Sequence, residues 1–165
     1  MMDRIPRDAE AAKFVKAAQQ LLASGNTGDE LLRNSARIQN ALPVRSPDRR
    51  VHSWFVPLIV GDRLAAFFQF LPDGTLMRFS SFQRRAGDFS TCPPAADWLD
   101  TQRIQTRADR YRLPGETAEE PFLSFDRSPD RLVWAVPLLN EQGASRLIYV
   151  VGETAYLPPG EGTIG

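Results

Sequence analysis

Hydrophobic residues are concentrated in one long block, residues 51–82, which contains three β-prone segments. Two short polar breaks, Gly61-Asp62 and Pro72-Asp73-Gly74, separate these segments. Glycine and aspartate at such breaks favour tight turns that return the chain directly onto itself. The block therefore predicts a three-stranded antiparallel meander, with strands over residues 51–60, 64–71 and 75–82.

The first two predicted strands are apolar on both faces, a pattern typical of strands that are covered on both sides. In the first strand Pro57 cannot donate a ladder hydrogen bond, and this favours an edge position or a bulge. An edge strand buried by a second subunit would satisfy both demands. The pattern thus predicts a sheet face that is covered by a homodimer, a ligand or a protein partner.

A second apolar block closes the chain, and its predicted strands cover residues 122–125, 131–139 and 146–151. The pattern W-x-V-P-L-aliphatic stands at residues 134–139 and also at residues 54–59. Each copy precedes a Gly-bearing turn and an apolar strand. Two interpretations stay open: duplication of one helix-plus-strand half, giving halves 29–84 and 94–157, or convergence of two similar strands.

Three helices are predicted. Residues 8–24 place Phe14 and other apolar residues on one stripe. The run Thr27-Gly28-Asp29-Glu30 matches a capping box, which would begin a second helix that ends before Pro43. A third helix is expected over residues 95–110, because the two prolines before it suit a first helical turn. Residues 107–121 are polar and predict an exposed loop.

At 165 residues the chain is long enough for one domain with its own core. The elements together predict a single α+β domain over residues 1–165. Its antiparallel sheet would have five or six strands, with two N-terminal helices packed on it. The third helix would lie between the two strand blocks.

Composition and charge narrow the function classes. The chain has 20 basic and 20 acidic residues, so no overall field attracts nucleic acid or an anionic membrane. Nucleic-acid binding is also disfavoured because no RNP-like motif accompanies the arginines near the meander. No apolar run approaches the ~20 residues that span a bilayer, and no signal-peptide pattern begins the chain. We therefore predict a soluble, cytoplasmic protein without membrane attachment.

No catalytic constellation can be identified. His52 is the only histidine, and Ser53 beside it should point to the opposite face of the strand, which would prevent a base–nucleophile pair. Cys92 is the only cysteine, so no intramolecular disulfide or cysteine metal cluster can form. The sequence therefore predicts no catalytic residues, no metal site and no cofactor.

Residues 131–157, RLVWAVPLLNEQGASRLIYVVGETAYL, resemble the strand pair of PepSY-type domains. That pair runs as a W-x-V strand, a Gly-bearing turn and a strand that ends in an acidic-x-T-G-like corner. Residues 54–76 are similar to the same pattern, and together the two segments cover about a third of the chain. The resemblance implies a small helix-on-sheet module that is noncatalytic and often inhibitory or protein-binding.

Two functional hypotheses follow. The first is a noncatalytic protein-binding module, of an inhibitory, immunity-type, chaperone-like or regulatory kind, acting through a protein partner or through self-association. The alternative is a small-molecule-binding protein or an enzyme with an apolar pocket between sheet and helices. The candidate binding residues are four bulky aromatic side chains of the strands: Trp54, Phe68, Phe70 and Trp134.

Overall fold

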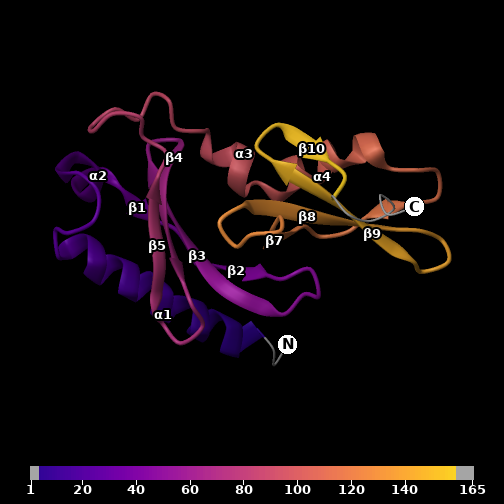
Figure 1. The fold of residues 1–165 in the computed structure, drawn as a ribbon, viewed down its shortest axis with the longest axis horizontal. Helices are drawn as coiled ribbons and strands as arrows, with labels where there is room; N and C mark the ends of the chain where they lie inside the picture. The colour runs from indigo at the N-terminus through magenta and orange to yellow at the C-terminus, as the bar shows by residue number, and fades with distance from the viewer. Residues whose placement is uncertain (1–3, 159–165) are drawn as a thin grey trace. The chain divides into compact units, whose positions relative to one another are not determined.

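The computed structural model describes residues 4–158. Over these residues the chain has an α+β fold with four α-helices, one 3-10 helix and ten strands (Figure 1). The α+β class agrees with the prediction from sequence. The expected five or six strands are too few, because the four additional strands are only two to four residues long. Segments of that length carry no readable period.

The chain divides into two compact units, and each is described by itself. Unit 1 comprises Met1–Val44 and Arg49–Ala95, and unit 2 comprises Arg45–Asp48 and Ala96–Gly165. In Figure 1 the first unit is mostly indigo to magenta, and the second is mostly salmon to yellow.

Unit 1 is built around the ten-residue strand β3 (Val51–Val60). Tight turns lead from it to β4 (Arg63–Phe70) and on to β5 (Leu76–Ser81), and both strand pairs are antiparallel. The predicted meander is present, and its strands begin and end within one residue of the expected positions. On its other side β3 is flanked by β1 (Arg37–Ile38) and β2 (Leu42–Arg45).

Pro57 lies in the interior of this arrangement and not at its edge. The Pro57 carbonyl accepts a hydrogen bond from Gln39 N at 3.0 Å. The nitrogen of Pro57 faces the same side of the strand as this carbonyl. Gln39 lies between β1 and β2, where the neighbouring ladder is interrupted. The missing N–H of the proline therefore costs no ladder bond, and its presence requires no edge position.

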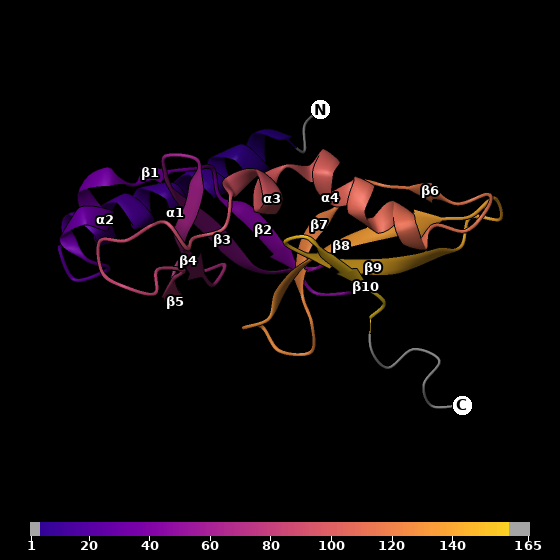
Figure 2. The same ribbon diagram turned by 90° about the horizontal axis from the view of Figure 1, so that it is seen from above.

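Helix α1 (Arg4–Ala23) packs on β3 of unit 1. Phe14 stacks on Trp54, with ring centroids 5.1 Å apart and an interplanar angle of 18°. Phe14 and Ala18, one turn further along the helix, are both fully buried. Figure 2 shows the helix on one side of the strands of this unit.

Helix α2 is shorter than expected and covers only Glu30–Ser35. Its N-cap is Asp29, whose carboxylate accepts a hydrogen bond from Leu32 N at 2.8 Å. The expected cap, Thr27, instead donates its hydroxyl to Leu21 O at 3.2 Å. The capping-box prediction was therefore wrong by two residues, because an equally good cap follows in the sequence.

Unit 2 is built around β8 (Leu132–Leu139). This strand pairs antiparallel with β7 (Phe122–Phe125) on one side and with β9 (Ser145–Val151) on the other. The short strand β10 (Thr154–Tyr156) extends the ladder beyond β9, and β6 (Thr117–Ala118) pairs with the end of β8.

The third expected helix is divided in two. Helix α3 (Ala95–Leu99) ends before Asp100, and this side chain begins α4 (Thr101–Ala108) by accepting hydrogen bonds from Gln102 N and Arg103 N. The 3-10 helix η1 (Asp109–Tyr111) follows. The expected exposed loop over 107–121 is partly wrong, because this segment contains buried Ala108, η1 and β6.

The strand pairs of the two units have the same register. From Trp54 to Leu58, the pairs of β3 with β4 are matched by pairs eighty residues later, such as Trp54–Phe70 by Trp134–Val150 and Val56–Phe68 by Val136–Ile148. The pair Arg37–Ile59 is matched in the same way by Thr117–Leu139. The register shift between Leu58 and Ile59 in unit 1 has no counterpart between β8 and β9. The hydrogen bond from Gln39 N to Pro57 O is matched in the same way by one from Glu119 N to Pro137 O. The pentapeptide RSPDR also stands before both tryptophan strands, at residues 45–49 and 127–131.

Candidate functional site

Three of the four candidate binding residues lie together in the core of unit 1. Trp54, Phe68 and Phe70 belong to one cluster with Phe14, and they are 3 %, 0 % and 1 % exposed. Their spacing of two along each strand places them on the face that α1 covers. In the described structure they are core side chains, and a role in binding stays a prediction.

The fourth candidate, Trp134, lies in unit 2 and differs from Trp54 in its hydrogen bonding. Its indole Nε1 donates to Trp98 O, near the end of α3, at 2.7 Å. Trp54 Nε1 is also buried, but within the part of the chain that the structure describes it has no acceptor. A buried N–H without an acceptor costs about 1–3 kcal/mol.

A shallow hollow of about 350 Å³ lies beside the core cluster of unit 1. Three of its lining residues, Ala11, Val15 and Ala41, pack in the same cluster as Trp54. The remaining lining residues are Ala12 and Asn40. The hollow is of ligand size, but Asn40 is its one polar side chain.

The expectation that His52 and Ser53 cannot interact was wrong. His52 Nδ1 lies 3.0 Å from Ser53 Oγ, because the ring reaches across the backbone to the side chain of its neighbour. Ser53 Oγ also accepts a hydrogen bond from Gln69 Nε2 at 2.8 Å, and Gln69 Oε1 accepts one from Arg78 Nε at 2.9 Å. Ser53 is fully buried, so this polar row across three strands offers no accessible nucleophile.

Other reactive groups are similarly occupied. Cys92 is buried, and burial raises the pKa of its thiol above the usual value, which makes it a poor nucleophile. In the part of the chain that the structure describes, no three His, Cys, Asp or Glu residues are grouped closely enough to hold a metal ion.

The outer edge of β5 is a further feature of unit 1. Among the described residues β5 pairs with β4 and with no other strand. Phe82 N donates to Ala65 O at 2.8 Å and so points toward the neighbouring strand. Backbone groups alternate in direction along a strand, and the N–H groups of Phe79 and Ser81 therefore point outward.

The corresponding edge of unit 2 is closed. Its outer strand β10 is three residues long, against six for β5. Tyr111 Oη donates to the Ala155 carbonyl of β10 at 3.0 Å. Arg107 Nη1 donates to Gly152 O, in the turn before β10, at 2.6 Å. The same position in the strand order is therefore occupied in one unit and available in the other.

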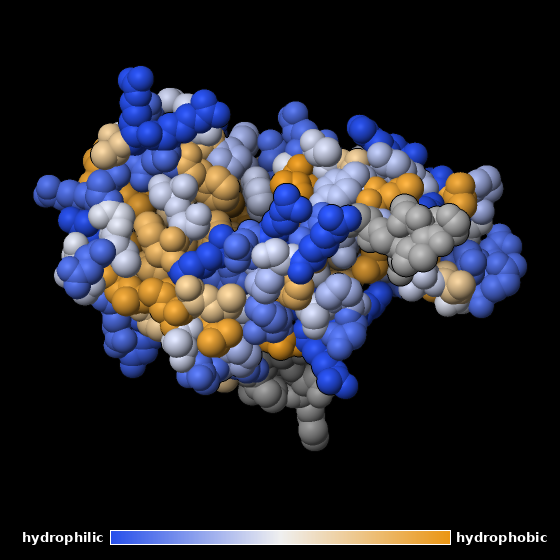
Figure 3. All heavy atoms as spheres, in the orientation of Figure 1, coloured by the Kyte–Doolittle hydropathy of each residue, from blue (hydrophilic) through white to orange (hydrophobic). Residues whose placement is uncertain are grey.

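Apolar side chains accompany the open edge. Leu76 on β5 is 38 % exposed, and Leu31 on α2 is 48 % exposed. Met77 and Phe79 are half-buried, and Phe79 contacts the ring of Phe68 with centroids 5.1 Å apart. Figure 3 shows orange, hydrophobic side chains gathered over the part of unit 1 where β5 lies.

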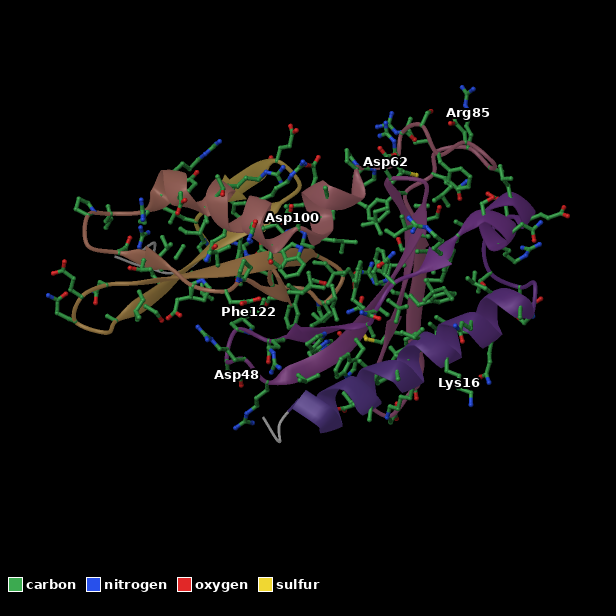
Figure 4. The ribbon with its side chains drawn as sticks, turned by 180° about the vertical axis from the view of Figure 1, so that it is seen from behind. Lys16, Asp48, Asp62, Arg85, Asp100 and Phe122 are labelled. Atoms are coloured by element: carbon green, nitrogen blue, oxygen red, sulfur yellow. The ribbon has the colours of Figure 1, made fainter. Side chains whose placement is uncertain are left out.

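A basic loop follows β5 and is held by Asp29. This carboxylate accepts hydrogen bonds from Gln83 Nε2 at 3.0 Å and from Gly87 N at 3.1 Å, in addition to capping α2. The N–H of Leu32, and then these two donors, hold the pKa of Asp29 below its usual value. Arg84 and Arg85 lie between the two anchored residues and are exposed, and Arg85 points away from the ribbon (Figure 4).

Charge is divided unevenly between the units. Unit 1 contains twelve basic and eight acidic residues, whereas unit 2 contains eight basic and twelve acidic residues. The neutral chain therefore combines a half of net charge +4 with a half of net charge −4. The zero net charge of the whole chain conceals this difference. The outer edge of β5 lies in the positive half.

Comparison of the chain with families of known proteins, with curated proteins and with solved structures found no match. The likeness to PepSY-type domains stays a prediction. Over residues 4–158 no helix is both long and apolar enough to cross a membrane.

Proposed function

We propose that the protein is a noncatalytic protein-binding module that takes up an extended polypeptide segment along β5. In this mode the segment adds one strand to an open sheet edge, and main-chain hydrogen bonds supply much of the affinity. The inhibitory, immunity-type, chaperone-like and regulatory roles all remain compatible with it, as does a cytoplasmic location.

The observation that carries the proposal is the contrast between the two outer strands. In unit 2 the edge strand β10 is short, and its Ala155 carbonyl is already bound by Tyr111. In unit 1 the six residues of β5 have no second strand partner among the described residues. An open edge of this length is one that proteins otherwise cover or shorten.

The side chains of β5 support the same interpretation. Leu76 and Phe79 pair with Phe70 and Phe68, and so lie on the face of the sheet that α1 covers. An added strand could place apolar side chains beside them. Arg78 pairs with Gln69 and lies on the opposite face. The edge therefore offers a different environment on each face, as a selective peptide site requires.

A selection experiment tests the proposal. Random peptides displayed on phage would be selected against the wild-type protein, and amide hydrogen exchange would then be measured with the selected peptide bound. We expect protection of the Phe79 and Ser81 N–H groups, because these point outward from β5.

Ser81→Pro is the blocking variant, since it removes one outward N–H and no bond to β4. Ser81→Ala is its matched control. It keeps the N–H and loses only the hydroxyl, which accepts from Gln83 N at 3.1 Å. We expect Ser81→Pro to abolish peptide binding and Ser81→Ala to retain it. Peptides that bind both variants equally would contradict the proposal.

One observation favours the small-molecule alternative. Trp54 Nε1 has no acceptor among the described residues, and the hollow beside α1 adjoins the cluster that contains it. A ligand that carries a hydrogen-bond acceptor could supply the missing bond. The indole N–H signal of Trp54 in an NMR spectrum tests this. A ligand whose acceptor binds this N–H shifts the signal, whereas the signal of an N–H that is only solvated does not move when a ligand is added.

A further inference from the structure

We infer that the segment bound along β5 is acidic, with carboxylates alternating with apolar side chains. This inference rests on the proposed function, since it names the partner of the same edge. It follows from the charges that accompany β5 and from the faces on which its side chains lie.

The outer edge of β5 is accompanied by positive charge. Residues 76–85 contain three arginines, Arg78, Arg84 and Arg85, and no carboxylate. They belong to the unit with net charge +4. A segment that carries carboxylates therefore gains both from nearby cations and from the field of the whole unit.

The basic loop after β5 is held in place by Asp29. Arg84 and Arg85 lie between Gln83 and Gly87, and both of these donate to the same Asp29 carboxylate. Asp29 thus holds the loop on both sides of the two cations before binding, through the Gln83 side chain and the Gly87 backbone. Preorganised charges lose less entropy on binding than mobile ones, so they discriminate better between partners.

The charges of β5 and its loop exclude a second copy of β5 as the occupant of this edge. Because residues 76–85 hold no carboxylate, this stretch of a second chain offers nothing to neutralise the three arginines. Cationic side chains on an edge strand are a recognised means of preventing self-pairing. The same charges select for an acidic strand and reject a basic one.

The two faces of the sheet at β5 favour a bound segment in which apolar and acidic side chains alternate. Successive side chains of an added strand point to opposite faces of the sheet. One face carries Leu76 and Phe79, and the other carries Arg78, whose guanidinium carbon lies 5.0 Å from the centre of the Phe67 ring. Apolar residues therefore suit the first face and carboxylates suit the second.

Three short synthetic peptides test the inference: one alternating Glu and Val, one alternating Gln and Val, and one alternating Lys and Val. Binding of each labelled peptide to the full chain would be measured by fluorescence anisotropy at low and at high salt. We expect the Glu peptide to bind on the order of tenfold more tightly than the Gln peptide at low salt. The difference should shrink at high salt, and the Lys peptide should not bind.

Two charge-reversal variants locate the effect. Arg85→Glu should weaken binding of the Glu peptide by on the order of tenfold. Lys16→Glu makes the same change in net charge at an exposed position on α1, and we expect less than about a twofold effect because salt screens it. Arg85→Lys keeps the charge and should bind nearly as well as the wild type.

The outcomes separate this inference from the proposed function. Equal binding of the Glu and Gln peptides, abolished by Ser81→Pro, would overturn the acidic preference and leave strand addition at β5 intact. Binding of the Glu peptide that Ser81→Pro does not affect would overturn both. Absence of binding by all three peptides would overturn the acidic preference, and the phage selection would then decide on strand addition by itself.

Discussion

Trp54 and Trp134 occupy the same place in two units whose strands pair in the same register, yet their surroundings differ. Trp134 donates to Trp98 O, whereas Trp54 Nε1 has no acceptor among the described residues. The outer strands differ in the same sense, because Tyr111 binds β10 in unit 2, whereas among the described residues no second strand pairs with β5 in unit 1. At these two positions unit 2 supplies a partner from its own chain, and among the described residues unit 1 does not.

A second difference concerns the row of side chains on the opposite face. In unit 1 the paired residues Gln69 and Arg78 form a polar row with Ser53. In unit 2 the corresponding pair is Tyr149 and Tyr156, whose rings meet edge to face with centroids 5.8 Å apart. β4 and β9 therefore carry different side chains at this position, and the polar row lies on the strands that end at β5.

The largest effect is expected from Phe14→Ala. Phe14 is fully buried and stacks on Trp54, so its removal leaves a cavity between α1 and β3. We expect a loss of about 3–5 kcal/mol in the free energy of unfolding. Urea unfolding followed by circular dichroism measures it. Phe14→Leu keeps most of the volume and should cost markedly less, and an equal loss in both variants would contradict a packing role.

Next in size is the comparison of two helix caps, one in each unit. Asp29 caps α2 and also binds Gln83 and Gly87, whereas the Asp100 side chain caps α4 through Gln102 N and Arg103 N. Loss of either cap costs about 0.5–2 kcal/mol. We expect Asp29→Ala to exceed Asp100→Ala by about 1 kcal/mol, because Asp29 accepts three hydrogen bonds and Asp100 accepts two. Urea unfolding of both variants checks this, and equal losses would show that the loop bonds add nothing to stability.

A smaller effect separates the two tryptophans. Substitution by phenylalanine removes similar volume at both positions, but only Trp134→Phe removes a hydrogen bond. We expect Trp134→Phe to be about 1–2 kcal/mol more destabilising than Trp54→Phe. Thermal and urea unfolding of the two variants would measure the difference. Equal losses would mean that Trp54 Nε1 does have an acceptor, such as a buried water or ligand.

The strands that could be predicted from the sequence are those with long apolar runs and tight turns between them. β3, β4 and β5 were expected within one residue of their observed ends. β1, β2, β6 and β10 were missed, because two to four residues show no alternation. The repeated W-x-V-P-L pattern pointed to two halves, and their common origin by duplication stays a prediction.

The candidate site could be predicted only in part. The sequence indicated an unpaired apolar strand surface, and Pro57 favoured an edge position or a bulge in its strand. The edge position was wrong, because the outer strand is β5, whereas a register shift does occur beside Pro57, between Leu58 and Ile59. Whether a strand is an edge depends on which others pair with it, and local pattern does not contain that information. The link from His52 to Ser53 was missed for a related reason, because alternation describes where side chains leave the backbone and not how far a long ring reaches.

Unit 2 has an ion pair between Arg146 and Glu116 for which the corresponding positions of unit 1 carry no charge. Arg146 binds Glu116 through Nε and Nη2, both at 2.9 Å, and also donates to Tyr111 O. Eighty residues earlier the corresponding positions are Ala36 and Ala66. The hydrogen bonds from Arg146, and then that from Leu113 N, lower the pKa of Glu116 from 4.5 to about 2.

A carboxylate whose pKa falls on folding stabilises the protein above its unfolded pKa. The contribution of Glu116 is therefore complete above about pH 4.5 and is lost as the pH falls toward 2. We expect the wild type to be more stable than Glu116→Gln at neutral pH, with the difference closing over that interval. Urea unfolding as a function of pH measures it, and Glu153→Gln, an exposed site in the same unit, corrects for the change in net charge. A difference that persists unchanged below pH 3 would mean that the glutamine is tolerated poorly for reasons of packing, and that the ion pair does not distinguish the two units energetically.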